Sequence, residues 1–210
     1  MKKFVLISAL SLLFFYCDAQ KELGKLLGVS AGYVPWGVER LECASADGLD
    51  DYTWKGRYSF KNPTLLLGFE IRNEVVSSLI ELSFSSFFVD KIDSANKRLG
   101  TYNIKQIGLA YHPGLLIMPR RRFQIPLRVG LGFNYYFHPW GGPRMENNLF
   151  VTLCAAAQFK FYVSNQVALY AGYSIHGGLA LKYDERFRIN GLGFKHYPEI
   201  GVLVNFKVNK

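Results

Sequence analysis

The sequence predicts an all-β fold, an eight-stranded antiparallel barrel of the up-and-down type. Three observations predict it: apolar residues alternate with small or polar ones, eight segments do so, and the connections between them are alternately long and short. The clearest segment is 123–137, F-Q-I-P-L-R-V-G-L-G-F-N-Y-Y-F, in which every odd position is apolar. A period of two sustained over such a length indicates a β-strand with two different faces.

The chain begins with the pattern of a secretory signal peptide. Two lysines precede an apolar run at 4–16, and a small-x-small ending follows at 17–19. This run of about 13 residues is shorter than the roughly 17 that a membrane-spanning helix needs. We therefore expect a signal peptide at 1–19, cleaved before Gln20, and a single domain at 20–210.

The remaining chain divides into eight expected strands and seven connections. The strands are expected at about 24–34, 63–72, 75–89, 101–118, 121–137, 148–162, 166–176 and 195–208. The long connections are 35–62, 90–100, 138–147 and 177–194, and the short ones are 73–74, 119–120 and 163–165. This strict alternation is typical of a barrel in an outer membrane, with tight periplasmic turns and longer outer loops. A soluble β-sandwich scatters its loop lengths instead.

One face of these strands is apolar. From the second strand onward it includes Leu65, Leu67 and Phe69, then Ile80, Leu82 and Phe84, then Ile107 and Leu109, then Val151 and Leu153, then Leu169 and Tyr173, then Ile200, Val202 and Val204. No later stretch of about 18 apolar residues offers a transmembrane helix, so only a closed barrel could span a membrane.

The other face is small or polar. In chain order it includes Gly28, Ser30 and Gly32, then Gly68, then Ser83 and Ser85, then Gln106 and Gly108, then Gly130 and Asn134, then Thr152 and Ala156, then Gly172, then Gly201 and Asn205. In a soluble barrel this face would meet water and be rich in Lys, Glu and Thr. Small residues instead fit the crowded interior of a narrow barrel, which places the apolar face in lipid. The sequence thus predicts a transmembrane β-barrel.

Aromatic residues gather near the expected strand ends, as they do at the two membrane interfaces of such barrels. The predicted aromatic girdle comprises Tyr33, Trp36, Phe88, Tyr135, Phe137, Trp140, Tyr173 and, at the opposite end, Phe206.

With these features the chain resembles the small eight-stranded outer-membrane barrels of the OmpA/OmpX type and the outer membrane protein beta-barrel domain families. The resemblance rests on the signal peptide, eight strands, three tight turns, four longer loops and the last strand, 200–206. It implies a monomer in the outer membrane, without a cofactor. In those families the last strand usually ends at an aromatic residue that the barrel-assembly machinery recognises, whereas here four residues follow Phe206.

Inward-facing charges are expected to plug the lumen. A buried charge persists only when it is paired and hydrogen-bonded. The expected network comprises Glu70, Glu81, Lys105, Arg128, Lys160 and Lys207. Arg128 in particular needs Glu70 or Glu81 as a partner. The alternative is a conducting pore, which the narrow bore of eight strands disfavours.

Two residues offer a possible catalytic pair. Ser174 and His176 share one face of a strand, about 7 Å apart. Outer-membrane lipid A deacylases also carry a His and a Ser two residues apart on a barrel strand, but in the reverse order. Without a positioned third group the pair is weak support for nucleophilic catalysis. A lipid A-modifying hydrolase is therefore kept as an alternative, and a polar lumen lining is preferred.

The remaining histidines and cysteines predict no metal site. His138, His176 and His196 lie near one rim, but their spacing matches no ligand motif. Cys43 and Cys154 occupy such different positions that we expect two unpaired thiols. No cofactor is expected.

The formal net charge is +9, and loss of the signal peptide lowers it by one. No nucleic-acid reader motif accompanies this charge, so no nucleic-acid partner is expected. Lys182, Arg186, Arg188 and Lys195 in the last loop would lie near lipopolysaccharide phosphates. The first loop, 35–62, is either a recognition surface or simply solvated.

We therefore expect an outer-membrane barrel with a structural or interaction role. Its expected partners are outer-membrane lipid and lipopolysaccharide, the barrel-assembly machinery during biogenesis, and an extracellular or envelope partner bound by the loops. A soluble periplasmic lipocalin-like ligand-binding barrel is a further alternative.

Overall fold

The computed structural model describes residues 26–43, 52–58, 64–73, 75–93, 95–118, 122–137, 149–182 and 188–207. The predicted signal peptide at 1–19, the loop at 138–147 with its Trp140, and the side chain of Lys207 lie outside what it describes.

The described residues form one antiparallel sheet. Its strands are β1 (Leu26–Val34), β2 (Gly37–Cys43), β3 (Tyr52–Tyr58), β4 (Thr64–Arg72), β5 (Ser77–Asp93), β6 (Arg98–His112), β7 (Gly114–Ile117), β8 (Phe123–Phe137), β9 (Leu149–Tyr162), β10 (Val167–Lys182) and β11 (Arg188–Lys207). The fold class predicted from the alternating pattern is confirmed.

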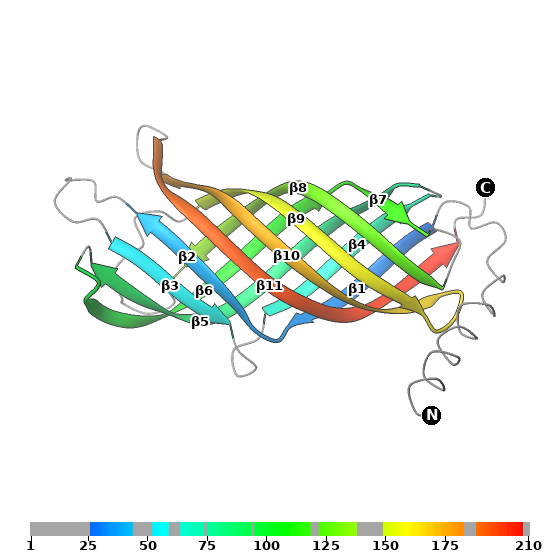
Figure 1. The fold of residues 1–210 in the computed structure, drawn as a ribbon, viewed down its shortest axis with the longest axis horizontal. Helices are drawn as coiled ribbons and strands as arrows, with labels where there is room; N and C mark the ends of the chain where they lie inside the picture. Colours follow the sequence, from blue (N-terminus) through cyan, green and yellow to red (C-terminus); the bar gives the residue numbers. More distant parts are fainter. Residues whose placement is uncertain are drawn as a thin grey trace, which may run out of the picture.

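The sheet closes on itself, because β1 pairs with β4 on one side and with β11 on the other. In three cases, two strands lie end to end and together cross the barrel wall as one strand would. We call each such pair, and each strand that crosses the wall alone, a stave. β1 continues into β2 across residues 35–36, β3 and β4 lie end to end beside β5, and β6 continues into β7 across Pro113, so the eleven described strands make eight staves. Figure 1 shows these staves running obliquely around the barrel.

The register of the sheet makes the barrel narrow. A path from each residue to its partner on the next strand can be followed around the wall. It starts at Leu169 on β10 and reaches β10 again at Leu179, ten residues further along the chain. The residues between are Val202, Ala31, Leu67, Leu82, Leu109, Phe133 and Val151. A shift of ten residues over eight strands tilts the strands by roughly 40° from the barrel axis. An interior of this size has room for side chains and little else.

Two connections that the sequence analysis expected to be loops are largely strand. Residues 37–43 and 52–58 in the expected first loop form the β2–β3 hairpin, which pairs with β11 and β5. In the expected last loop, β10 runs on to Lys182 and β11 already begins at Arg188. These extensions lie at the end of the barrel away from the β4–β5 turn (Figure 1). The strands remain paired in these extensions, although their residues no longer alternate regularly between apolar and polar as they do nearer the tight turns.

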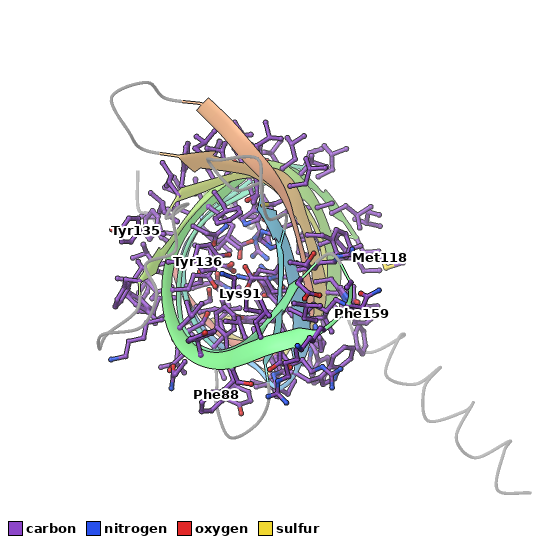
Figure 2. All side chains as sticks on the ribbon, turned by 90° about the vertical axis from the view of Figure 1, so that its left-hand side faces the viewer. Phe88, Lys91, Met118, Tyr135, Tyr136 and Phe159 are labelled. Carbon is purple, nitrogen blue, oxygen red and sulfur yellow. The ribbon has the colours of Figure 1, made fainter. Side chains whose placement is uncertain are left out.

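Burial alternates along the strands as the two-faced pattern requires. On β8, Arg128 and Asn134 are buried, whereas Leu131 and Phe133 between them are exposed. Figure 2, which looks along the barrel, shows Tyr136 inside the wall and its neighbour Tyr135 outside it. The exposed apolar side chains form a belt around the barrel, and the polar side chains fill its interior.

Candidate functional site

The barrel lumen concentrates the chemically distinctive side chains of the described chain. Four buried carboxylates and four buried cations lie on its inward face: Glu39, Glu70, Glu81, Glu199, Arg72, Arg128, Lys160 and Lys195. The equal numbers of opposite charges suit an interior from which water is largely excluded, because an unpaired buried charge is costly.

Glu70 on β4 is the centre of this network. Its Oε1 lies 3.1 Å from Arg128 Nη2 and accepts a 2.7 Å hydrogen bond from Ser77 Oγ. Its Oε2 accepts from Lys160 Nζ. Arg128 also donates to Ser77 Oγ, at 2.7 Å, and to Gln158. One carboxylate thus holds two cations that come from β8 and β9, on the far side of the barrel.

A second layer closes the end nearer the tight turns. Arg72 donates to Gln124 and to the hydroxyl of Tyr162, and its guanidinium lies 5.1 Å from the centre of the Tyr162 ring. Asn205 Nδ2 donates to the same hydroxyl at 3.3 Å. Tyr162 also packs with buried Leu203. Polar and aromatic side chains from four staves therefore meet across this end.

Two further carboxylates lie within the lumen, on the side of Glu70 that faces the strand extensions. Glu199 accepts a 2.7 Å hydrogen bond from Gln158 Nε2. Glu81 is buried on the inward face of β5. Gln158, which accepts from Arg128 and donates to Glu199, links the Glu70 cluster to Glu199.

A cluster of imidazole, thiol and phenol groups lies in the lumen still nearer the strand extensions. His176 Nδ1 lies 2.9 Å from Cys154 Sγ, and its Nε2 lies 3.1 Å from the Tyr197 hydroxyl. The His112 ring meets the His176 ring edge-on, with 6.2 Å between centroids. His176 thus makes both of its hydrogen bonds to residues other than Ser174. Ser174 is buried on the same face, but the expected catalytic pair has no direct contact among the interactions described.

Apolar side chains cap the lumen at the end that carries the strand extensions. Val34, Leu66, Phe87, Val89, Ile104, Tyr136, Phe150 and Tyr197 form one buried cluster. The Tyr136 hydroxyl donates to Glu39 within this cap. The lumen is therefore filled along its length: polar and aromatic side chains lie near the tight turns, paired charges lie in the middle, and a mainly apolar cluster that also encloses Glu39 lies toward the strand extensions.

Two of the lysine assignments made from the sequence are wrong. Lys105 is exposed, because it belongs to the outward set of β6 with Ile107 and Leu109, so it takes no part in the lumen network. Lys195, expected in a loop near lipopolysaccharide phosphates, is buried in the lumen on β11, where its Nζ lies 3.4 Å from Gln106 Oε1. The strand extension turns its side chain inward.

Three other members of the lumen network were not recognised from the sequence. Arg72 and Glu199 have the same parity as the inward residues Glu70 and Gly201, so the period-two pattern could have identified both. Glu39 could not be recognised in this way, because its segment was expected to be a loop.

The expected girdle residues are placed as follows. Trp36, Phe88, Tyr135, Tyr173 and Phe206 are exposed, while Tyr33 and Phe137 are half-buried. Tyr173 does not mark a strand end, because β10 continues nine residues beyond it, and its hydroxyl lies 2.6 Å from His196 Nδ1. Trp36 lies at the bend between β1 and β2.

His176 and His196 lie on opposite faces of the wall, His176 inward and His196 outward beside Tyr173. Within the described part of the chain, no group of three His, Cys, Asp or Glu side chains is arranged to hold a metal ion. Cys154 is a free, buried thiol.

No described helix is long and apolar enough to cross a membrane.

Comparison with known proteins identifies the fold. No protein-family model and no curated protein matches the sequence. The outer membrane protein OprG from Pseudomonas aeruginosa has a similar structure, with a TM-score of 0.66 and 13% identity over 91% of this chain and 100% of its own. Neisserial surface protein A (NspA) has a TM-score of 0.53 and 15% identity over 87% of this chain and 97% of its own. The chain therefore has the fold of the small eight-stranded outer-membrane β-barrels.

Proposed function

We propose that this protein is an integral outer-membrane barrel that acts as a scaffold and not as a pore or an enzyme. In this proposal the wall holds the protein in lipid, and the end that carries the β2–β3 and β10–β11 extensions interacts with envelope or extracellular partners. Secretion through the signal peptide and insertion by the barrel-assembly machinery remain expectations from the sequence.

The observation that carries the proposal is the contrast between the two sides of the wall. Exposed residues such as Val129 (64%) and Leu153 (65%) project outward from strands whose inward neighbours include buried Arg128 and Cys154. A soluble ligand-binding barrel would have polar residues outside and an apolar cavity inside. The reverse arrangement favours lipid around the wall, because apolar surface is stable there and costly in water.

The filled lumen argues against a conducting role. Glu70, Arg128 and Lys160 bridge the interior from three staves, and the apolar cap lies above them. Ions would have to displace paired charges and then cross an apolar layer. A role in hydrolysis is also disfavoured, because His176 hydrogen-bonds Cys154 and Tyr197 instead of activating Ser174.

Fractionation of cells that express the full chain tests the membrane part of this proposal. The protein should be found with the outer membrane and should migrate faster on a gel when it is not heated. Recovery in the soluble periplasmic fraction would contradict it.

Planar-bilayer recording tests the scaffold part. The refolded protein should produce no single-channel steps, with heat-unfolded protein as the control for detergent artefacts. Reproducible steps whose conductance rises with salt concentration would identify a pore and overturn the scaffold proposal.

A further inference from the structure

The outer wall of the barrel is hollowed over β7, β8, β9 and β10, which run side by side (Figure 1). The hollow is an open trough with a volume of about 510 Å³, which is within the range of ligand-binding sites. Arg128 borders it only with its backbone, because the side chain is buried in the lumen. We call the trough the wall hollow and define it by six exposed residues: Leu127, Val129, Ala155, Ala157, Tyr173 and Ile175.

The floor of the wall hollow consists of two alanines on β9. Ala155 and Ala157 are consecutive outward residues of this strand, and the next outward residues on either side of them are Leu153 and Phe159. Both of these large side chains are more than half exposed. Six residues of extended strand separate them, which is roughly 20 Å. The trough therefore runs along β9 and has a bulky side chain at each end.

One large residue beside the floor leaves it uncovered. Tyr173 on β10 is the direct partner of Ala157, and its ring is large enough to cover that alanine. Its hydroxyl lies instead 2.6 Å from Nδ1 of His196 on β11, which pairs with the other edge of β10. The centroids of the two rings are 6.0 Å apart. This hydrogen bond holds the Tyr173 ring toward β11 and away from the alanines.

The wall hollow lies in the half of the apolar belt that is nearer the tight turns. Ala157 is five residues before Tyr162, where β9 ends. Five residues span roughly 17 Å of strand, or about 13 Å along the barrel axis at the tilt of about 40°. Between the hollow and the turns, Phe123 packs with Phe159 and Phe161 at centroid distances of 6.1 and 4.9 Å. Aromatic side chains at such a level are typical of a membrane interface.

We propose that the wall hollow binds one acyl chain of a phospholipid from the leaflet at the tight-turn end. This inference rests on the proposed function, which places the wall in lipid. Tight turns of outer-membrane barrels are periplasmic, so this is the periplasmic leaflet. The hydrocarbon of one leaflet is about 15 Å thick. A chain whose headgroup lies at the level of the turns therefore reaches the alanines with the carbons near its end.

Close packing favours a chain that lies in the wall hollow. Apolar groups in lipid have no water to expel, so association there depends on van der Waals contact, and small residues allow a close approach. A chain in the trough contacts the alanine floor and the side chains of β8 and β10 at once, and an unfilled trough would forfeit these contacts. Its sides, which include Val129 and Ile175, belong to the exposed apolar belt, so the hollow is continuous with the surface that faces lipid.

The shape of the wall hollow favours a flexible chain over a second copy of the barrel. Leu115, Val129 and Leu153 border or flank it, and each is more than 60% exposed. A rigid wall of another barrel would meet these protruding side chains before it reached the alanines. An acyl chain is narrow enough to enter between them.

Native mass spectrometry of the full refolded chain in detergent micelles tests the inference. The probes are dipalmitoyl phosphatidylethanolamine, dihexanoyl phosphatidylethanolamine, whose chains are too short to reach the hollow from the turns, and lipid A. The test variant is Ala157→Leu, which fills the floor. The matched control is Ala31→Leu, which adds the same side chain at another exposed alanine, on β1.

We expect the native protein to retain one dipalmitoyl lipid more strongly than the dihexanoyl lipid. Ala157→Leu should bind the dipalmitoyl lipid at least about fivefold more weakly, because the chain loses its packing against the floor. Ala31→Leu should stay within about twofold of the native protein, since this residue is three strands away from the floor. A compact band on an unheated gel establishes that each variant is folded, and Ala157→Val replaces a test variant without this band.

Equal retention of the two phosphatidylethanolamines would overturn the inference, because the length of the chain would then be irrelevant. Unchanged binding by Ala157→Leu, or an equal loss in Ala31→Leu, would also overturn it. Retention of lipid A alone would assign the hollow to the other leaflet, and a lipid-free dimer that Ala157→Leu disrupts would assign it to a second copy. These outcomes leave the proposed function intact. That function fails separately if the native protein is absent from the outer membrane or lacks the compact unheated band.

Discussion

Replacing Glu70 by Gln tests the ionic network at its centre. Gln has nearly the same shape as Glu but carries no charge, so Arg128 and Lys160 would keep a neighbour and lose their counter-ion. In the native protein Glu70 Oε1 and Arg128 Nη2 are 3.1 Å apart, and both side chains are almost fully buried. Lys160 is equally buried against the other carboxylate oxygen.

The expected loss of stability is large. Coulomb's law with an effective dielectric constant of about 20 gives about 5 kcal/mol for two unit charges at the Glu70–Arg128 distance. Removing one member of a buried ion pair generally costs about 3–5 kcal/mol, because the other charge stays buried without a partner. We therefore expect Glu70→Gln to lower the free energy of unfolding by about 3–5 kcal/mol.

The assay is urea unfolding of the protein refolded into lipid vesicles, followed by tryptophan fluorescence and by the compact band on unheated gels. Asp90→Asn is the control, because its partner Arg98 is 62% exposed and Asp90 itself is 40% exposed. An exposed pair of this kind contributes about 0–1 kcal/mol. A loss below about 1 kcal/mol for Glu70→Gln, equal to that of the control, would refute the network.

A double variant makes the reasoning more specific. Lys160→Met in the Glu70→Gln background removes one of the two uncompensated cations, so the double variant should be more stable than the sum of the two single changes predicts. Strict additivity would mean that Glu70 and Lys160 do not act as a pair.

The other predictions concern close packing, accessibility and the outward face. Gly130→Ala should destabilise the barrel by about 1–3 kcal/mol or more in the same urea assay, because its new Cβ would lie 1.9 Å from a backbone oxygen, that of Tyr111. Gly177→Ala, where nothing lies within 4 Å, should be tolerated, and equal effects would contradict the register between β6 and β8. The Cys154 thiol should resist maleimide in the folded barrel and react in urea; rapid labelling without urea would reveal an open lumen. Lys105→Ala should change the free energy of unfolding by less than about 0.5 kcal/mol. A loss as large as that of Glu70→Gln would mean that Lys105 does belong to the lumen network.

The part of the barrel that carries the apolar belt could be predicted from the sequence because its residues alternate clearly between apolar and polar. Along β8 the outward residues within the belt are apolar, so the period of two identifies both the strand and its faces. Above the belt, the outward residues of β3 are Lys55 and Arg57. The strand pairing continues, but both sides are now polar or mixed, and the pattern that indicates a strand is lost.

The same loss of pattern explains what was missed in the lumen. Glu39 is an inward residue of a segment that reads as a loop, so nothing in the sequence marked its side chain as buried. Lys195 is the first residue of the expected strand 195–208 and has the inward parity of Glu199, but it was grouped with the charges of the last loop. Arg72 and Glu199 lay within expected strands with inward parity and could have been identified. The partners within the network depend on contacts across the barrel, such as Glu70 with Lys160, which strand periodicity does not specify.

The central claim is that the apolar face of the wall lies in lipid and the polar face lines a filled interior. Spin labels on cysteines introduced at Leu131 and Leu153, in a chain whose native cysteines are replaced by serine, test it most directly. Both residues are exposed members of the belt. In bilayers, we predict high accessibility of these labels to molecular oxygen and low accessibility to a water-soluble nickel chelate. High accessibility to the nickel chelate at both positions would mean that this face meets water, and would contradict the claim.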